Sequence, residues 1–255
     1  MIAYFSCTGN SRRVAQLLAE RLVDNVVDLP LLRAAEPSVS IDGGKLVFVF
    51  PIHSWGLPKG FADFLTRLRV NGCPQYCCMV ATCGDDCGLA ARQWREVMEA
   101  KGMTADATYS VQMPNTYVIF PGFDVDKSEV EQRKLSAVPQ AADALCQRIE
   151  AMEKGDFTHH GSVAWLKSRI IYPWFMRHVD DTPFATTDAC VGCGRCAAAC
   201  PTANITISSH KPQWHGDCLN CLACYHTCPH HAVAFGRRTR GKGQYTCPDN
   251  KSTSK

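Results

Sequence analysis

Two stretches of the sequence place cysteines at the same spacing. They read Cys190-x2-Cys193-x2-Cys196-x3-Cys200-Pro201 and Cys218-x2-Cys221-x2-Cys224-x3-Cys228-Pro229. Spacing by two residues lets three thiolates of one loop reach three iron atoms of a [4Fe-4S] cube, while the fourth cysteine points toward the other cube. The duplication therefore predicts two [4Fe-4S] clusters that exchange their fourth ligands.

The exchange assigns four ligands to each cluster. One cluster takes Cys190, Cys193, Cys196 and Cys228, and the other takes Cys218, Cys221, Cys224 and Cys200. Structural zinc, which also uses CxxC pairs, is the alternative. Zinc gives no reason for the third cysteine or for the Cys-Pro ending of both halves, so we favour iron–sulfur clusters.

The other eight of the sixteen cysteines show no repeated spacing. Cys7 and Cys83 fall in the loops described below. Seven cysteines are expected to be buried and to pack as small hydrophobic side chains. They are Cys73, Cys77, Cys78, Cys83, Cys87, Cys146 and Cys247. No signal-peptide pattern follows Met1, so we expect a reducing, cytoplasmic location rather than a disulfide-stapled secreted protein.

The first 113 residues alternate β-rich runs with helical patterns. Strands are predicted at 2–5, 25–29, 45–50, 75–82 and 105–113. Helices are predicted at 11–23, 58–70, 88–101 and 127–153, and residues 30–44 are too rich in Pro, Gly and Ser for a helix. Pro139 predicts a kink or a break in the last helix. Strand–helix alternation with short connections predicts an α/β fold with a doubly wound, five-stranded parallel sheet.

Composition divides the chain into four segments. They are the α/β domain at 1–153, an apolar connector at 154–183, a cysteine-rich domain at 184–236 and a basic tail at 237–255. The connector is too apolar for a free linker, and we expect it to pack between the domains. The cysteine-rich segment contains so few large aliphatic residues that its core needs support from its metal clusters.

A polar loop joins the first predicted strand to the first helix. It consists of Ser6, Cys7, Thr8, Gly9, Asn10 and Ser11. Hydroxyl groups, a glycine and the free N–H groups of a helix N-terminus together form an anion-binding site. An ordinary strand–helix turn is the alternative. In a doubly wound sheet, ligands bind at the switch point beyond the carboxyl ends of the strands, where this loop lies.

Two further loops follow later strands. The first contains Pro51, His53, Ser54, Trp55 and Gly56, and the second contains Thr82, Cys83, Gly84 and Asp85. Together with the first loop they resemble the FMN-binding loops of flavodoxins. The resemblance implies that Trp55 stacks on the isoalloxazine ring and that residues 82–85 contact its pyrimidine edge. A core or interface role for Trp55 is the alternative. No GxGxxG follows a strand, so FMN is predicted rather than a nicotinamide dinucleotide.

The cysteine motifs at 184–236 resemble bacterial two-cluster ferredoxins, which implies a small α+β domain. The whole chain resembles a family of flavodoxin–ferredoxin fusion proteins, and the loop Met113–Tyr117 extends that resemblance. It implies an electron-transfer protein that passes electrons between two [4Fe-4S] clusters and an FMN, coupling one-electron and two-electron partners.

Two other functions remain open from the sequence. One is an FMN-dependent reductase with its own small-molecule substrate, the clusters serving as an internal electron supply. In that case 115–123 would be the substrate loop and His53 a proton donor. The other is a regulatory module with structural or oxygen-sensing clusters.

Charge limits the partners. The net charge is +3, and residues 236–255 alone carry six basic groups and one acidic group. This excess is too small to indicate nucleic acid, and no uncharged apolar run approaches the ~18 residues of a membrane span. We expect a redox protein as partner, which the basic tail could dock if that partner is acidic. A solvated, disordered tail is the alternative, and the oligomeric state stays open.

Overall fold

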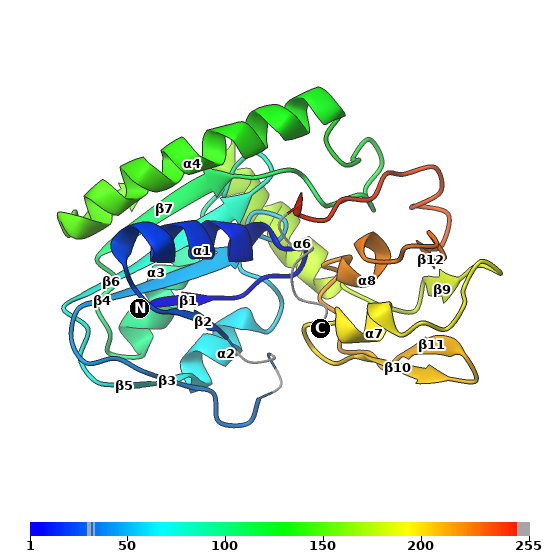
Figure 1. The fold of residues 1–255 in the computed structure, drawn as a ribbon, viewed down its shortest axis with the longest axis horizontal. Helices are drawn as coiled ribbons and strands as arrows, with labels where there is room; N and C mark the ends of the chain where they lie inside the picture. Colours follow the sequence, from blue (N-terminus) through cyan, green and yellow to red (C-terminus); the bar gives the residue numbers. More distant parts are fainter. Residues whose placement is uncertain (30–31, 33, 249–255) are drawn as a thin grey trace.

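A computed structural model describes residues 1–29, 32 and 34–248 of the chain (Figure 1). Its central sheet has six parallel strands in the order β2-β1-β4-β6-β7-β8. The strands are β1 Ile2–Tyr4, β2 Val26–Asp28, β4 Lys45–Pro51, β6 Tyr76–Cys83, β7 Ala107–Gln112 and β8 Gly155–Phe157. The first five have the 2-1-3-4-5 order of flavodoxin-like folds, which confirms the α/β fold class. Strand β8, from residues assigned above to the connector, adds a sixth strand at the edge.

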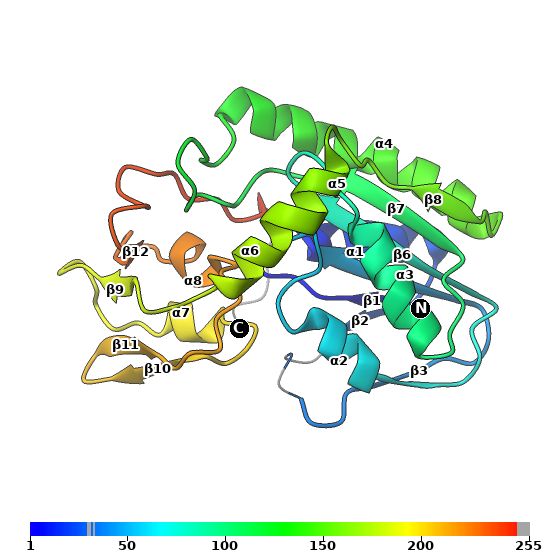
Figure 2. The ribbon, with the colours of Figure 1, turned by 180° about the vertical axis from the view of Figure 1, so that it is seen from behind.

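Four helices cover the two faces of the sheet (Figures 1 and 2). They are α1 Asn10–Leu22 and α4 Ser128–Glu150 on one face, and α2 Phe61–Arg67 and α3 Ala90–Ala100 on the other. Successive residues of a strand point to opposite faces, so Phe48 packs with the α2 and α3 side and Val49 with the α1 and α4 side. Burial on both faces explains why β1, β4 and β6 are nearly continuous apolar runs.

Most of the additional cysteines belong to this core. Cys77 and Cys78 are fully buried on opposite faces of β6. Burial raises the pKa of the Cys77 thiol to about 12, so this group stays neutral and packs as a small apolar side chain. Cys73 is exposed, contrary to the expectation that it would be buried.

One small parallel sheet was not predicted. It pairs β3 Ser38–Ser40 with β5 Arg69–Asn71. Both strands have three residues, and their sequences Ser-Val-Ser and Arg-Val-Asn hold only one apolar residue each. Such runs are too short to show a period of two. Residues 30, 31 and 33 of the loop expected at 30–44 lie outside the described residues.

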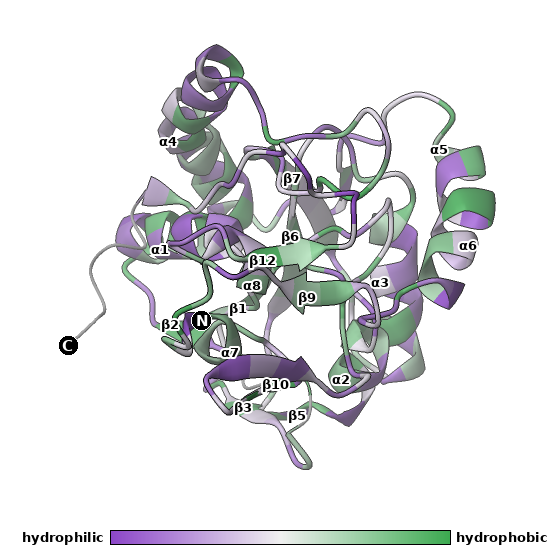
Figure 3. Cartoon of the chain, turned by 90° about the vertical axis from the view of Figure 1, so that its right-hand side faces the viewer, coloured by the Kyte–Doolittle hydropathy of each residue, from purple (hydrophilic) through white to green (hydrophobic). Residues whose placement is uncertain are grey.

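The cysteine-rich region is a small α+β unit. Its elements are β9 Phe184–Thr186, α7 Arg195–Ala198, β10 Ile205–Ser208, β11 Lys211–Trp214, α8 Ala223–His226 and β12 Val233–Phe235. Strands β9 and β12 pair antiparallel and are coloured as hydrophobic in Figure 3, while β10 and β11 form a hairpin. Val118 and Ile119, from the loop after β7, join its core. The α/β domain thus completes a core that the cysteine-rich segment cannot fill alone.

The connector forms a continuous helical segment along the α/β domain (Figure 2). It comprises α5 Ala164–Leu166, the π-helical turn η1 Lys167–Ile171 and α6 Tyr172–Arg177. Its inner face makes polar contacts, because the Ser168 hydroxyl donates to the carbonyl of Trp55 and Tyr172 donates to the carbonyl of Leu57. Phe175 is buried whereas Trp165 is 64% exposed, so one side of the connector packs against the rest of the protein and the other side is exposed. No helix in the described parts of the chain has the length and apolarity needed to cross a membrane.

Helix α4 contains an internal proline, which should lower the stability of the protein. It runs without a break from Ser128 to Glu150 although Pro139 lies inside it. Proline lacks the N–H that would bond to the preceding turn and its ring crowds that turn. Pro139→Ala should therefore raise the free energy of unfolding by about 1–3 kcal/mol, measured by urea denaturation. The control Ser136→Ala should change it by about 0.5 kcal/mol or less; an equal gain in both variants would contradict the explanation.

Candidate functional site

The eight cysteines of the duplicated motif surround two cavities. A cavity of about 340 Å3 is lined by Cys190, Cys193, Cys196 and Cys228. A second, of about 300 Å3, is lined by Cys200, Cys218, Cys221 and Cys224. The chain therefore groups the thiols in the two crossed sets expected from the spacing, with one thiol of each set supplied by the other motif.

Backbone groups around the thiols suit a negatively charged ligand. The N–H groups of Asn204, Asn220 and Ala232 donate to the sulfurs of Cys200, Cys218 and Cys228 at 3.3, 3.2 and 3.3 Å. Burial raises the pKa of Cys218 to about 12, so its thiolate needs a bound cation. Within the described chain no three His, Cys, Asp or Glu side chains converge on a single-ion site. A cube binds each thiolate to a different iron, so its ligands need not converge.

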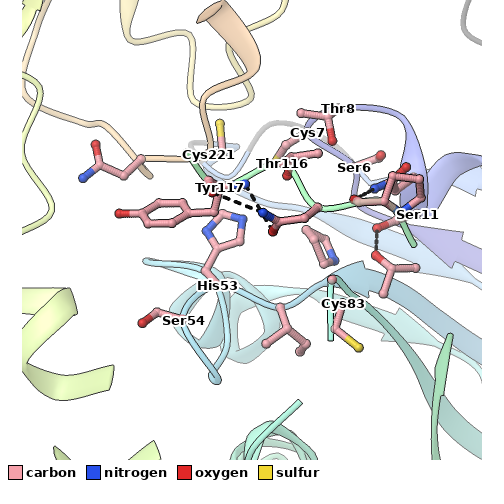
Figure 4. A pocket seen from close by; sticks show the side chains of 18 of the residues that line it. Ser6, Cys7, Thr8, Ser11, His53, Ser54, Cys83, Thr116, Tyr117 and Cys221 are labelled. Atoms are coloured by element: carbon pink, nitrogen blue, oxygen red, sulfur yellow. Dashed lines mark hydrogen bonds between the residues drawn. The ribbon is translucent and has the colours of Figure 1, made fainter. Parts of the chain in front are cut away.

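A separate cavity of about 640 Å3 lies at the carboxyl edge of the sheet (Figure 4). All three loops expected to bind the cofactor contribute to it. From the predicted set, the lining residues are Ser6, Cys7, Thr8, Asn10, Ser11, Pro51, His53, Ser54, Thr82, Cys83 and Gly84. The β1–α1, β4–α2 and β6–α3 loops thus meet at the switch point between β1 and β4, as expected for a doubly wound sheet.

Four predicted residues lie outside that cavity. Trp55 and Asp85 line an adjoining cavity of about 540 Å3, which shares Ser54 and Gly84 with the first. Gly9 precedes helix α1 with φ 99°, and it therefore serves the turn. Gly56 lies against the Tyr172 ring, where a Cβ would approach the ring carbons to within 2.3–2.6 Å.

The turn that carries Trp55 is strained. His53 and Gly56 exchange two backbone hydrogen bonds of 3.0 and 3.1 Å, and the central residues Ser54 and Trp55 have φ of 46° and 64°. Two positive φ values identify a type I′ turn, which strongly favours Asn and Gly. A tryptophan held in this conformation costs of order 1–3 kcal/mol and is characteristic of functional sites.

Unpartnered polar atoms face the same cavity. Ser54 Oγ and His53 Nδ1 are buried without a hydrogen-bond partner, and both residues line the cavity wall. Such atoms favour a polar ligand that can bond to them. Burial lowers the pKa of His53 to about 4, partly offset by a hydrogen bond with the Leu219 backbone, so the imidazole is neutral at pH 7.

A lysine of the connector, Lys167, lies over the indole ring of Trp55. The Lys167 ammonium lies 5.2 Å from the centre of this ring and forms an ion pair of 2.5 Å with Asp86. The Asp86 side chain is only 8% exposed, whereas that of Asp85 is 82% exposed. Lys167 thus neutralises the buried carboxylate, and the solvated Asp85 exerts a weak, screened field.

Most polar side chains of the first loop bond within the protein. Gly9 N–H donates to Ser6 Oγ at 3.2 Å, the Ser11 and Thr82 hydroxyls lie 2.7 Å apart, and Asn10 Nδ2 donates to the Pro114 carbonyl at 3.0 Å. These bonds fix the loop. Its capacity for an anion therefore rests mainly on backbone N–H groups at the start of α1.

Several lining residues were not assigned to the cofactor site by sequence reasoning, although 115–117 fall in the loop expected to bind a substrate under the reductase alternative. They are Ile52, Pro114, Asn115, Thr116, Tyr117, Phe175, Asn220 and Cys221. Asn220 and Cys221 come from the cysteine-rich region, and no local pattern could place them beside the sheet. The neighbouring Cys221 side chain and burial raise the pKa of Cys7. Asn115 donates to the Asp124 carbonyl at 2.6 Å and so organises its own loop.

Comparison with known proteins bears mainly on the cysteine-rich region. Residues 189–232 match the 4Fe-4S dicluster domain family. No curated protein matches the chain. The match supports an iron–sulfur region and a redox role for the chain.

Solved structures similar to this chain span between 52% and 58% of it. They include a protein described as a flavoprotein from Bacteroides uniformis (16% identity, TM-score 0.35) and a flavodoxin from Streptococcus pneumoniae (18%, 0.33). A third is the Trp repressor binding protein from Bacillus subtilis (12%, 0.31). The matches span 52%, 58% and 55% of this chain and 95%, 97% and 96% of the respective structures.

The strained turn gives a stability prediction. Ser54 combines a positive φ with a buried, unpartnered hydroxyl. Ser54→Gly should therefore raise the free energy of unfolding by about 1 kcal/mol in urea denaturation, because glycine tolerates this conformation. The same exchange in a helix, Ser136→Gly, should lower it by about 0.5–1 kcal/mol. A loss in both variants would show that Ser54 is not strained.

Proposed function

We propose that the chain is an electron-transfer protein that carries an FMN at the carboxyl edge of the sheet and two [4Fe-4S] clusters in the cysteine-rich region. FMN exchanges one or two electrons and each cluster exchanges one, so the assembly would couple one-electron and two-electron partners. The backbone N–H groups at the start of α1 would hold the phosphate. Trp55 would lie beside the ring, and His53 and Ser54 would offer it polar contacts.

One observation carries this proposal. Cys221, a ligand in the second thiol set, lines the same cavity as the loop Ser6–Ser11. A group bound in that cavity and a cluster bound by Cys221 would be separated only by the side chains of this wall. Cys7 of that loop and Cys221 line this cavity together.

The first thiol set supplies the opposite end of the route. Cys193 is exposed, whereas Cys224 of the second set is buried. A partner protein would therefore exchange electrons with the cluster at Cys193. The cluster at Cys221 would link that entry point to the flavin site.

The reductase alternative receives less support. A proton donor should have a pKa near the working pH, whereas that of His53 is lowered to about 4. Asn115, expected in the substrate loop, is occupied by hydrogen bonds within that loop.

Cofactor content gives the first test. Protein prepared without oxygen should contain about eight iron and eight sulfide per chain, together with one releasable FMN. Cys193→Ser and Cys218→Ser should each lower iron by about four. The control Cys73→Ser removes an exposed thiol outside both sets and should leave iron unchanged. Zinc in place of iron would contradict the clusters, and absence of bound FMN would contradict the flavin.

Electron redistribution gives the second test. After a substoichiometric pulse of a one-electron reductant, the flavin absorbance should change as electrons move from the clusters to the flavin. Loss of the second cluster in Cys218→Ser should remove the phase due to this transfer, because its cavity adjoins the flavin site. Loss of the first cluster in Cys193→Ser should retain transfer from the second. Equal behaviour of the two variants would contradict the proposed order.

A further inference from the structure

The basic C-terminal segment folds back onto the protein (Figure 1). We call residues 242–248 the C-terminal strap. Lys242 donates to the Phe123 carbonyl at 2.7 Å, and the Gly243 N–H donates to Asp124 at 2.9 Å. Residues 249–255 lie outside the described residues. The strap therefore starts against the loop that follows β7.

Helix α8 holds the strap in place. Tyr225 donates its hydroxyl to the Lys242 carbonyl at 2.8 Å and accepts a bond at its own carbonyl from Gln244 at 2.6 Å. The Tyr245 N–H donates to His226 Nδ1 at 3.1 Å. Cys224 lies in the same helix and Cys228 follows it closely, so Tyr225 and His226, which hold the strap, lie between one thiol of each set.

The far end of the strap reaches the predicted phosphate loop. Tyr245 donates its hydroxyl to Asn10 Oδ1 at 2.9 Å, and the Cys247 N–H donates to the Thr8 carbonyl at 3.1 Å. Tyr245 and Cys247 are 4% and 2% exposed. Their bonds therefore lie in the protein interior, where a lost partner leaves a buried polar group unsatisfied.

His226 adds a second connection. Its Nδ1 accepts from Tyr245, so its Nε2 carries the proton and donates to the Thr116 carbonyl at 2.6 Å. Thr116 lines the same cavity as Thr8 and Asn10. One turn of helix, placed between cluster ligands, thus positions two walls of the flavin site.

We infer that the C-terminal strap makes flavin binding depend on cluster assembly, with Tyr245 and His226 as positioning residues. This inference rests on the proposed function, since it takes FMN as the ligand of the cavity. Helix α8 has only four residues and cannot be stable by itself. Ligation of Cys224 and Cys228 fixes it. Loss of the clusters releases α8, then the strap, and then residues 6–11.

The test measures FMN affinity by fluorescence titration in full-length protein with clusters and after their removal. Removal of the clusters should weaken FMN binding. In protein with clusters, Tyr245→Phe and Cys247→Pro should each weaken binding about threefold to tenfold without loss of iron, because each removes one buried hydrogen bond to the loop. In protein without clusters the same substitutions should have little effect.

Tyr76→Phe is the matched control. It removes a phenol hydroxyl that bonds to Tyr109 and the Glu153 carbonyl, at the start of β6 and far from the loop. It should leave the FMN affinity unchanged. The inference would be overturned if Tyr245→Phe weakened FMN binding equally in protein with and without clusters. It would also be overturned if this substitution left the FMN affinity unchanged in both forms of the protein.

Hydrogen–deuterium exchange separates this inference from the proposed function. The amides of residues 6–11 should exchange faster after cluster removal and in Tyr245→Phe, whether or not FMN is the ligand. Faster exchange without any FMN binding would support the strap while contradicting FMN as cofactor. Unchanged exchange together with normal FMN binding would overturn the strap alone.

Discussion

Close packing of the cysteine-rich region against the carboxyl edge of the sheet is the contact on which the rest of the site depends. The region has a small core, which Val118 and Ile119 of the α/β domain complete. The sheet edge has an open switch point, and Cys221 of the cysteine-rich region closes part of it. The α/β domain therefore supplies apolar side chains to the core of the cysteine-rich region, and that region supplies part of the cavity wall at the sheet edge. This mutual completion places a set of four thiols beside the switch point, where doubly wound sheets generally bind ligands.

Rigidity at the site comes from hydrogen bonds between loops rather than from local structure. Asn10 connects Pro114 and Tyr245, and Ser11 connects to Thr82. The strained turn at Ser54 and Trp55 is kept in place by the connector, through Ser168 and Lys167. Strain of this kind persists only where surrounding contacts fix the conformation. The connector therefore supports the turn through Ser168 and Lys167, although its composition is largely apolar.

The sequence predicted what depends on local periodicity or fixed spacing. Strands β1, β4, β6 and β7 are largely buried and lie within apolar runs that could be recognised, and the spacing of the cysteine motif predicted both thiol sets. Strands β3, β5 and β8 have three residues each and leave no periodic signal. Cys221 in the cavity wall and Tyr245 against Asn10 were unpredictable, because a bond across 235 positions of the chain has no local signature. Cys73 was expected in the core because a cysteine count alone does not distinguish a buried thiol from an exposed one.

The fold of the basic segment changes its expected role. Arg237, Arg238 and Arg240 belong to a stretch whose two ends are fixed, by β12 and by the strap. Arg238 lies 5.9 Å from the Phe235 ring, so even this charge is partly positioned by the cysteine-rich core. A mobile tail would search for an acidic partner through a wide volume, whereas charges on a fixed stretch act as a surface of defined shape. Under the proposed function, a partner attracted to these arginines would approach the cysteine-rich region, where Cys193 is exposed, rather than the buried loop that the strap covers.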